Sequence, residues 1–194
     1  DSGGDRDYEL ERTTYGVFSE LQLPVLDDLI VSAAIRYDEI GSVKDKSIGV
    51  DVNEAESDVT YKVSFRYTAS DDLVLRGSIG TGFRAASLRQ IAEPRIRFGV
   101  TGAPYNCPFT GADPRSKGCR PTAVQYNVFR EGNASLAPET SDQVSLGFVY
   151  APSNEFSFEM DYWSIDISEQ VSSPSQPYMW DSQNAGTLFN DQFI

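Results

Sequence analysis

Apolar and polar side chains alternate along several stretches of the chain. In the clearest stretch, residues 58–68, every second position is apolar and the positions between are polar or charged. Successive side chains of a β-strand point to opposite sides, whereas a helical pattern repeats about every 3.6 residues. The pattern therefore predicts a strand with one apolar face, formed by Val59, Tyr61, Val63, Phe65 and Tyr67.

Six such stretches follow one another in pairs, and each pair is joined by a short turn, which is typical of β-hairpins. The turns are expected at 24–28, 71–72 and 151–154. The predicted fold is all-β, an antiparallel meander of about six long strands. These strands lie near 13–23, 29–38, 58–68, 73–81, 141–150 and 156–167.

The last predicted strand changes phase. After Tyr162 the apolar positions shift by one residue and continue at Trp163, Ile165 and Ile167. A change of phase of this kind predicts a β-bulge, or the point where the strand leaves its sheet.

The segments between the hairpins are much longer than the turns within them. They are expected at 39–57, 82–139 and 168–194. A compact soluble domain seldom needs an irregular connection as long as the second. Outer-membrane β-barrels, in contrast, combine short periplasmic turns with long extracellular loops.

The alternation alone leaves two environments open for the apolar face, membrane lipid or the interior of a soluble β-sandwich. The predicted strands of about ten residues exceed the usual five or six of soluble proteins. Ten residues at about 3.3 Å each, tilted by roughly 40°, span about 25 Å, which is the height of the apolar band of a barrel. Strand length therefore favours the barrel.

Composition excludes several classes of function. A net charge of −13 argues against nucleic-acid binding, which requires basic surfaces. The chain has no histidine, so Ser-His-Asp and Cys-His catalysis and most zinc sites are excluded. The spacing of Cys107 and Cys119 fits neither a redox CxxC nor a metal motif. A disulfide formed in an oxidising compartment is favoured over two free thiols.

Five segments, in order along the chain, resemble signature stretches of TonB-dependent outer-membrane receptors. The segment Leu75–Leu88, LRGSIGTGFRAASL, is similar to the family pattern LRgSyg.GFRaPsL. Gly132–Ser141, GNASLAPETS, resembles the pattern GNpnLkPEts. The remaining three segments are residues 15–24, 35–38 and 158–167.

This resemblance implies part of a 22-stranded barrel in the bacterial outer membrane, in contact with lipid. The complete receptor would contain a plug domain and a TonB box, neither of which is visible in this sequence. It would bind a siderophore, cobalamin or an oligosaccharide and import it with energy transmitted by TonB. No enzymatic step and no cofactor are implied. The chain would form an internal part of the C-terminal half of the barrel.

Two other classes of function remain to be tested. One is a soluble β-sandwich that binds a ligand or carbohydrate or acts as an adhesin. The other is an outer-membrane enzyme, which would need acid and nucleophile residues converging at the rim of the loops.

The candidate ligand-binding residues lie in the expected loop 82–139. Its arginines could hold a carboxylate or phosphate in a bidentate manner, and its tyrosines could stack against a sugar or catecholate. Alternatively, the arginines pair with nearby acidic residues. The acidic segment 45–58 lacks EF-hand spacing, so it is interpreted as a solvated loop rather than a calcium site. The candidates are Arg84, Arg89, Arg95, Arg97, Tyr105 and Tyr126; no catalytic or metal-binding residues are predicted.

Overall fold

The computed structural model describes residues 7–109, 111–120 and 122–181. They form two compact units, and each is described by itself. The strand unit consists of residues 7–92 and 133–171, and the loop unit consists of residues 93–132 together with the described residues from 172 onward.

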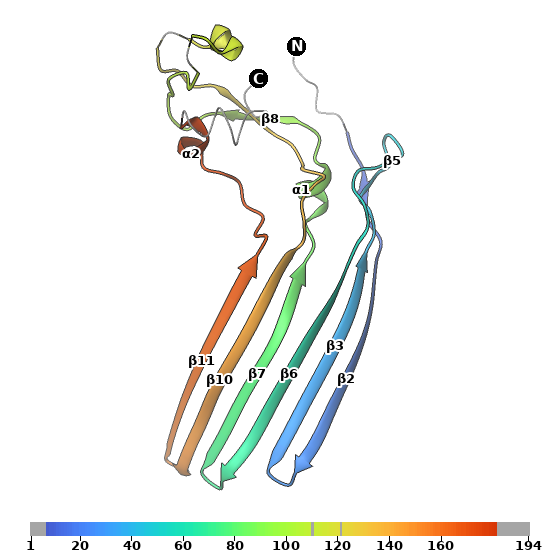
Figure 1. Ribbon diagram of the computed structural model, residues 1–194, viewed down its shortest axis with the longest axis vertical. Helices are drawn as coiled ribbons and strands as arrows, with labels where there is room; N and C mark the ends of the chain where they lie inside the picture. Colours follow the sequence, from blue (N-terminus) through green and yellow to red (C-terminus); the bar gives the residue numbers. More distant parts are fainter. Residues whose placement is uncertain (1–6, 110, 121, 182–194) are drawn as a thin grey trace. The chain divides into compact units, whose positions relative to one another are not determined.

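A single antiparallel sheet of six long strands makes up most of the strand unit. Its order is β11-β10-β7-β6-β3-β2 (Figure 1). Each long strand therefore lies beside the long strands that precede and follow it in the chain. The predicted six-stranded meander is confirmed. The strands are β2 (Thr14–Leu26), β3 (Leu29–Ile40), β6 (Glu56–Ser70), β7 (Leu73–Arg84), β10 (Glu139–Ser153) and β11 (Phe156–Ser168).

The first turn occupies only the end of its expected range, and the third lies mostly later in the chain than expected. The tight turns are at 27–28, 71–72 and 154–155, because Pro24 and Pro152 belong to the strands. Proline cannot donate a hydrogen bond to a neighbouring strand and is tolerated at a sheet edge or a bulge. Pro24 lies beside a register shift in the outermost strand β2, and Pro152 lies within the shift in β10.

The strand register places the apolar residues of neighbouring strands on one face, which we call the apolar face. Val63 of β6 pairs with Ala33 on one side and with Ile79 on the other, and Ile79 pairs with Val144 of β10. Val63 remains 39% exposed, because no second sheet covers this face among the described residues of the strand unit. Within the described strand unit, the apolar face thus has no second sheet packed against it.

The predicted interruption of the last strand after Tyr162 is wrong. β11 pairs with β10 without a break from Phe158 to Ser168. Backbone pairing does not depend on side-chain polarity, so the change of phase moves apolar side chains to the other face instead of bending the strand. Trp163 consequently lies on the face that carries Glu159 and Asp161, which we call the polar face.

The connections of the strand unit contain more regular structure than the sequence indicates. Three two-residue strands form a small sheet, β1 (Leu10–Glu11), β4 (Lys44–Asp45) and β5 (Val50–Asp51). The expected loop 39–57 therefore contains β4 and β5. A helix, α1 (Leu88–Ala92), follows β7. The only residues of the strand unit that form a buried apolar cluster, among those described, are Val43, Ala86 and Ile91.

The loop unit is built around a two-stranded antiparallel hairpin. Its elements are β8 (Ile96–Val100), the 3-10 helix η1 (Pro114–Gly118), β9 (Asn127–Arg130) and α2 (Gln176–Trp180). Cys107 and Cys119 form the predicted disulfide, with their Cα atoms 5.5 Å apart. The expected loop 82–139 thus contains α1, β8, η1 and β9. Within the described ranges, no helix is long and apolar enough to cross a membrane. Of the expected loop 168–194, residues 182–194 lie outside the described part.

Candidate ligand-binding site

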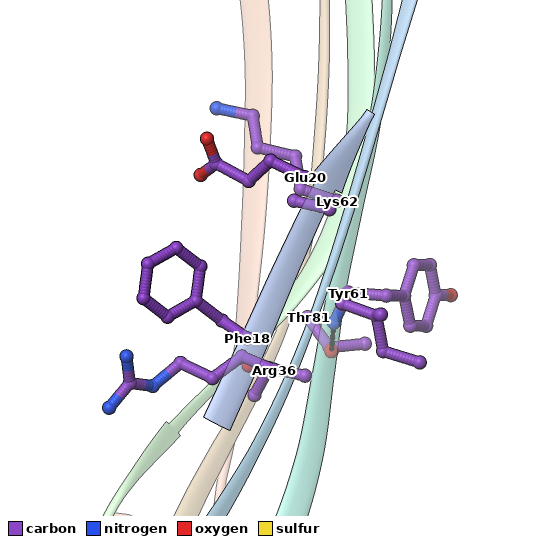
Figure 2. Close-up of a pocket in the computed structure, with 9 residues that line it drawn as sticks. Phe18, Glu20, Arg36, Tyr61, Lys62 and Thr81 are labelled. Atoms are coloured by element: carbon purple, nitrogen blue, oxygen red, sulfur yellow. Dashed lines mark hydrogen bonds between the residues drawn. The ribbon is translucent and has the colours of Figure 1, made fainter. Parts of the chain in front are cut away.

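The polar face of the sheet contains a shallow concavity of about 370 Å³ between β2, β3 and β6. Glu20 and Lys62 project from this face on either side of Ala34, their shared register neighbour, while Tyr61 projects to the opposite side (Figure 2). Phe18 and Arg36 also project from the polar face and line the concavity. The concavity is open and lies outside the segment that contains the predicted ligand-binding residues.

Arg84, one of the candidates, is held in a structural ion pair at the end of β7. Its Nε and Nη2 atoms each donate to a carboxylate oxygen of Glu139 at 2.6 Å. The same carboxylate accepts the backbone N–H of Val171 at 2.8 Å. Glu139 therefore joins the end of β7, the start of β10 and the segment after β11, which supports the acidic-pairing alternative for Arg84.

Arg89 also belongs to the strand unit, where it lies on α1. This helix contributes Ile91 to the buried cluster, and the backbone N–H of Ile91 donates to the carbonyl of Ser87. The structure does not bring Arg84 or Arg89 into the loop unit that contains the other four candidates.

Arg95 and Arg97 lie on the hairpin of the loop unit and contact neutral groups. The guanidinium of Arg95 stacks over the ring of Phe129 at 4.4 Å from its centroid. Arg97 is the register partner of Phe129, and its Nη2 donates to the amide oxygen of Asn127 at 3.0 Å. Arg95 directly precedes β8 and stacks on the ring of the residue that pairs with Arg97, so both arginines lie on the same face of the hairpin. Both side chains are exposed.

Tyr105 and Tyr126 pack against one tryptophan that the sequence analysis did not single out. The ring centroid of Trp180 is 4.8 Å from that of Tyr105 and 5.3 Å from that of Tyr126. The indole N–H of Trp180 also donates to the carbonyl of Asn106 at 3.1 Å. These tyrosine rings thus hold α2 against the segment around the disulfide, and each has one ring face engaged in packing.

The aromatic cluster continues directly from the hairpin. Thr101 follows β8 and Tyr126 precedes β9, and the backbone N–H of Thr101 donates to the carbonyl of Tyr126 at 2.9 Å. Gln125 adds a hydrogen bond from its side-chain amide to the carbonyl of Thr101. The structure therefore brings four of the six candidates, Arg95, Arg97, Tyr105 and Tyr126, into one small unit.

The disulfide loop has its own electrostatic anchor. Asp113 caps η1 by accepting the backbone N–H of Arg115, and its carboxylate also pairs with the Arg115 guanidinium at 2.6 Å. These hydrogen bonds, first that of the side chain and then that of the backbone, lower the pKa of Asp113 to about 2. Among the described residues, no group of three or more acidic, cysteine or histidine side chains is arranged to hold a metal ion.

The chain belongs to a family of outer-membrane receptors. The family described as TonB dependent receptor-like, beta-barrel matches residues 1–190. The crystal structure of the siderophore receptor PirA from Acinetobacter baumannii is similar, with a TM-score of 0.56 and 18% sequence identity. The match covers 80% of this chain and 18% of the length of that receptor. No curated protein sequence matches. The likeness to PirA concerns the fold, and the match to the family model establishes membership.

Proposed function

We propose that the complete receptor binds a scarce nutrient at the cell surface and imports it across the bacterial outer membrane with energy transmitted by TonB. The nutrient would be a siderophore, cobalamin or an oligosaccharide. The protein is a transporter with no enzymatic step, and its strand unit is part of the barrel wall. The loop unit supplies residues that select the ligand.

The observation that carries this proposal is the exposed apolar face of a single-layer sheet. Val59, Val63 and Phe65 of β6 remain 37–50% exposed, although they lie in the middle of a six-stranded sheet. Burial of apolar surface away from water is the main favourable term in folding, so a face of this extent requires an apolar environment. Lipid hydrocarbon is that environment in an outer-membrane barrel.

The two other classes of function are less well supported. A β-sandwich needs a second sheet on the apolar face, and the described residues of the strand unit provide none. An enzyme of the outer membrane needs a convergent acid and nucleophile. The carboxylates of Glu159 and Asp161 instead both pair with Arg76 on the polar face.

An uptake assay tests the proposal. The complete receptor is expressed in cells that lack their own receptors, and labelled nutrients are supplied one at a time. The panel is a ferric tricatecholate, ferric citrate, a neutral ferric trihydroxamate, cyanocobalamin and maltotriose. One member should accumulate, and accumulation should cease when TonB is deleted. Uptake that does not require TonB, or no accumulation of any member, would overturn the proposal.

A further inference from the structure

Basic residues outnumber acidic residues in the segment 93–132, although the chain as a whole is acidic. The segment 93–132 contains six of the 16 lysines and arginines but only three of the 29 acidic residues. Local charge of one sign raises the concentration of oppositely charged ligands near a surface. The distribution therefore favours a negatively charged ligand near this segment.

The three arginines at the β8–β9 hairpin contact neutral groups, as Arg12 does when it donates to the carbonyl of Ala86, whereas four other arginines pair with carboxylates. Among the described residues, Arg36, Arg76, Arg84 and Arg115 form ion pairs with carboxylates. In contrast, the side chains of the hairpin arginines contact neutral groups. Phe129 lies under Arg95, the Asn127 amide accepts from Arg97, and Phe98 lies under Arg130. No carboxylate of the described residues forms an ion pair with these three.

Stacking on a ring leaves the hydrogen-bonding edge of a guanidinium available. The five N–H donors of arginine lie in the plane of the group, whereas the ring contacts one face of that plane. The contact of Arg95 with the ring of Phe129 is a cation–π interaction that helps to hold the guanidinium in place. Arg97 uses one N–H for Asn127 and retains the others.

The hairpin directs its arginines to two faces. Arg95 and Arg97 share the face of Phe129, since Arg97 and Phe129 are register partners and Arg95 stacks on that ring. Arg130 follows Phe129 on β9 and pairs with Ile96, so it lies on the opposite face. Only one face therefore presents two guanidinium groups.

From this arrangement we infer that the Arg95–Arg97 face binds an anionic group of the imported nutrient, a carboxylate, phosphate or catecholate oxygen. The inference rests on the proposed import function and narrows its substrate class to anionic nutrients. Phe129 and Asn127 are positioning residues that hold the two guanidinium groups. Arg84 is not part of this site, because its guanidinium is paired with the carboxylate of Glu139.

The uptake assay described above tests this inference with single variants of the complete receptor. Wild type should accumulate an anionic member of the panel, the ferric tricatecholate or ferric citrate. Arg95→Gln and Arg97→Gln should each raise the concentration for half-maximal uptake about tenfold or more, as expected for loss of a charge-assisted hydrogen bond. The maximal rate should stay close to that of wild type, because transport itself is unaffected.

Arg130→Gln is the matched control, since it removes the same charge from the same hairpin on the opposite face. It should leave the half-saturating concentration close to the wild-type value. Equal effects of all three substitutions, or none, would overturn the inference and leave the proposed function standing. Accumulation of only a neutral nutrient would also overturn the inference and leave the proposed function standing. If no member accumulates, the proposed function fails together with the inference.

A second measurement distinguishes the nutrient from the membrane as the source of the anion. Purified wild-type receptor and both variants are titrated with detergent micelles that contain lipid A or dephosphorylated lipid A. Binding to both micelles should be the same for wild type and variants. A phosphate-dependent loss in the variants with unchanged nutrient uptake would assign the arginines to lipid phosphate and overturn the inference.

Discussion

Arg76 on β7 reaches across the intervening strand β10 and pairs with Asp161 on β11. The Nε and Nη2 atoms of Arg76 lie 3.0 and 2.6 Å from the two carboxylate oxygens of Asp161. The residue between them in the register is Gly147, whose missing side chain leaves the space in which the two side chains meet. A Cβ atom at this position would clash with the Asp161 carboxylate and lie 2.9 Å from the carbonyl of Met160.

We expect Gly147→Ala to lower the free energy of unfolding of the complete receptor by about 1–3 kcal/mol, the usual cost of overpacking. Denaturant unfolding in lipid vesicles, followed by loss of the folded band on unheated gels, measures this change. Gly118→Ala is the control, because a Cβ atom there meets nothing within 4 Å. Similar stability of both variants would contradict the proposed role of Gly147.

The two faces of β6 should differ in their tolerance of charge. Val63 lies on the apolar face and Ser64 on the polar face, where it pairs with Ser32 and Ser78. Val63→Arg should cost about 2–4 kcal/mol if this position lies near the bilayer midplane, and Ser64→Arg should cost much less. The same unfolding assay compares the two variants. Equal costs would show that the assignment of the faces is wrong.

Trp180 should stabilise the fold of the loop unit. Trp180→Ala removes two ring contacts, and these are expected to contribute roughly 1–3 kcal/mol in total. Limited proteolysis of the complete receptor should then cleave the loop unit several times faster. Trp163→Ala on β11 should leave this cleavage rate unchanged. Tyr126→Phe should also have little effect, because among the described residues no group hydrogen-bonds its buried hydroxyl.

Asp113 should titrate at unusually low pH. Its folded pKa of about 2 lies below the ordinary value near 3.9, so its contribution to stability is complete above the ordinary value. That contribution should be lost as the pH falls through about 2. The carboxyl carbon resonance of Asp113, assigned by comparison with Asp113→Asn, would report the titration. A midpoint near 4 would show that the pair with Arg115 does not persist in solution.

The alternation of side chains allowed the strands and their faces to be predicted, because it is a local property of the chain. The row from Val59 to Tyr67 fixes one face of β6 without reference to any partner. The disulfide could also be predicted from the sequence, since Cys107 and Cys119 are the only two cysteines. The turn positions were less accurate, because proline is a turn signal that edge strands and bulges also tolerate.

Only the tertiary structure shows which of the candidate arginines pair with a carboxylate and which contact neutral groups. Nothing local to Arg84 or Arg95 indicates that the first meets a carboxylate 55 residues away and the second meets the ring of Phe129. Both partners are brought in by strand pairing across long connections. Likewise, Trp180 reaches Asn106 across 74 residues, and no periodicity in the sequence marks that contact.

The sequence by itself determined the sheet, the apolar face and the family resemblance, because alternation and motif order are written along the chain. The tertiary structure alone decided which charges are neutralised and which remain available to a ligand. The reason is physical: strand patterning follows from the geometry of neighbouring residues, whereas the partner of a charged side chain depends on how distant segments are brought together.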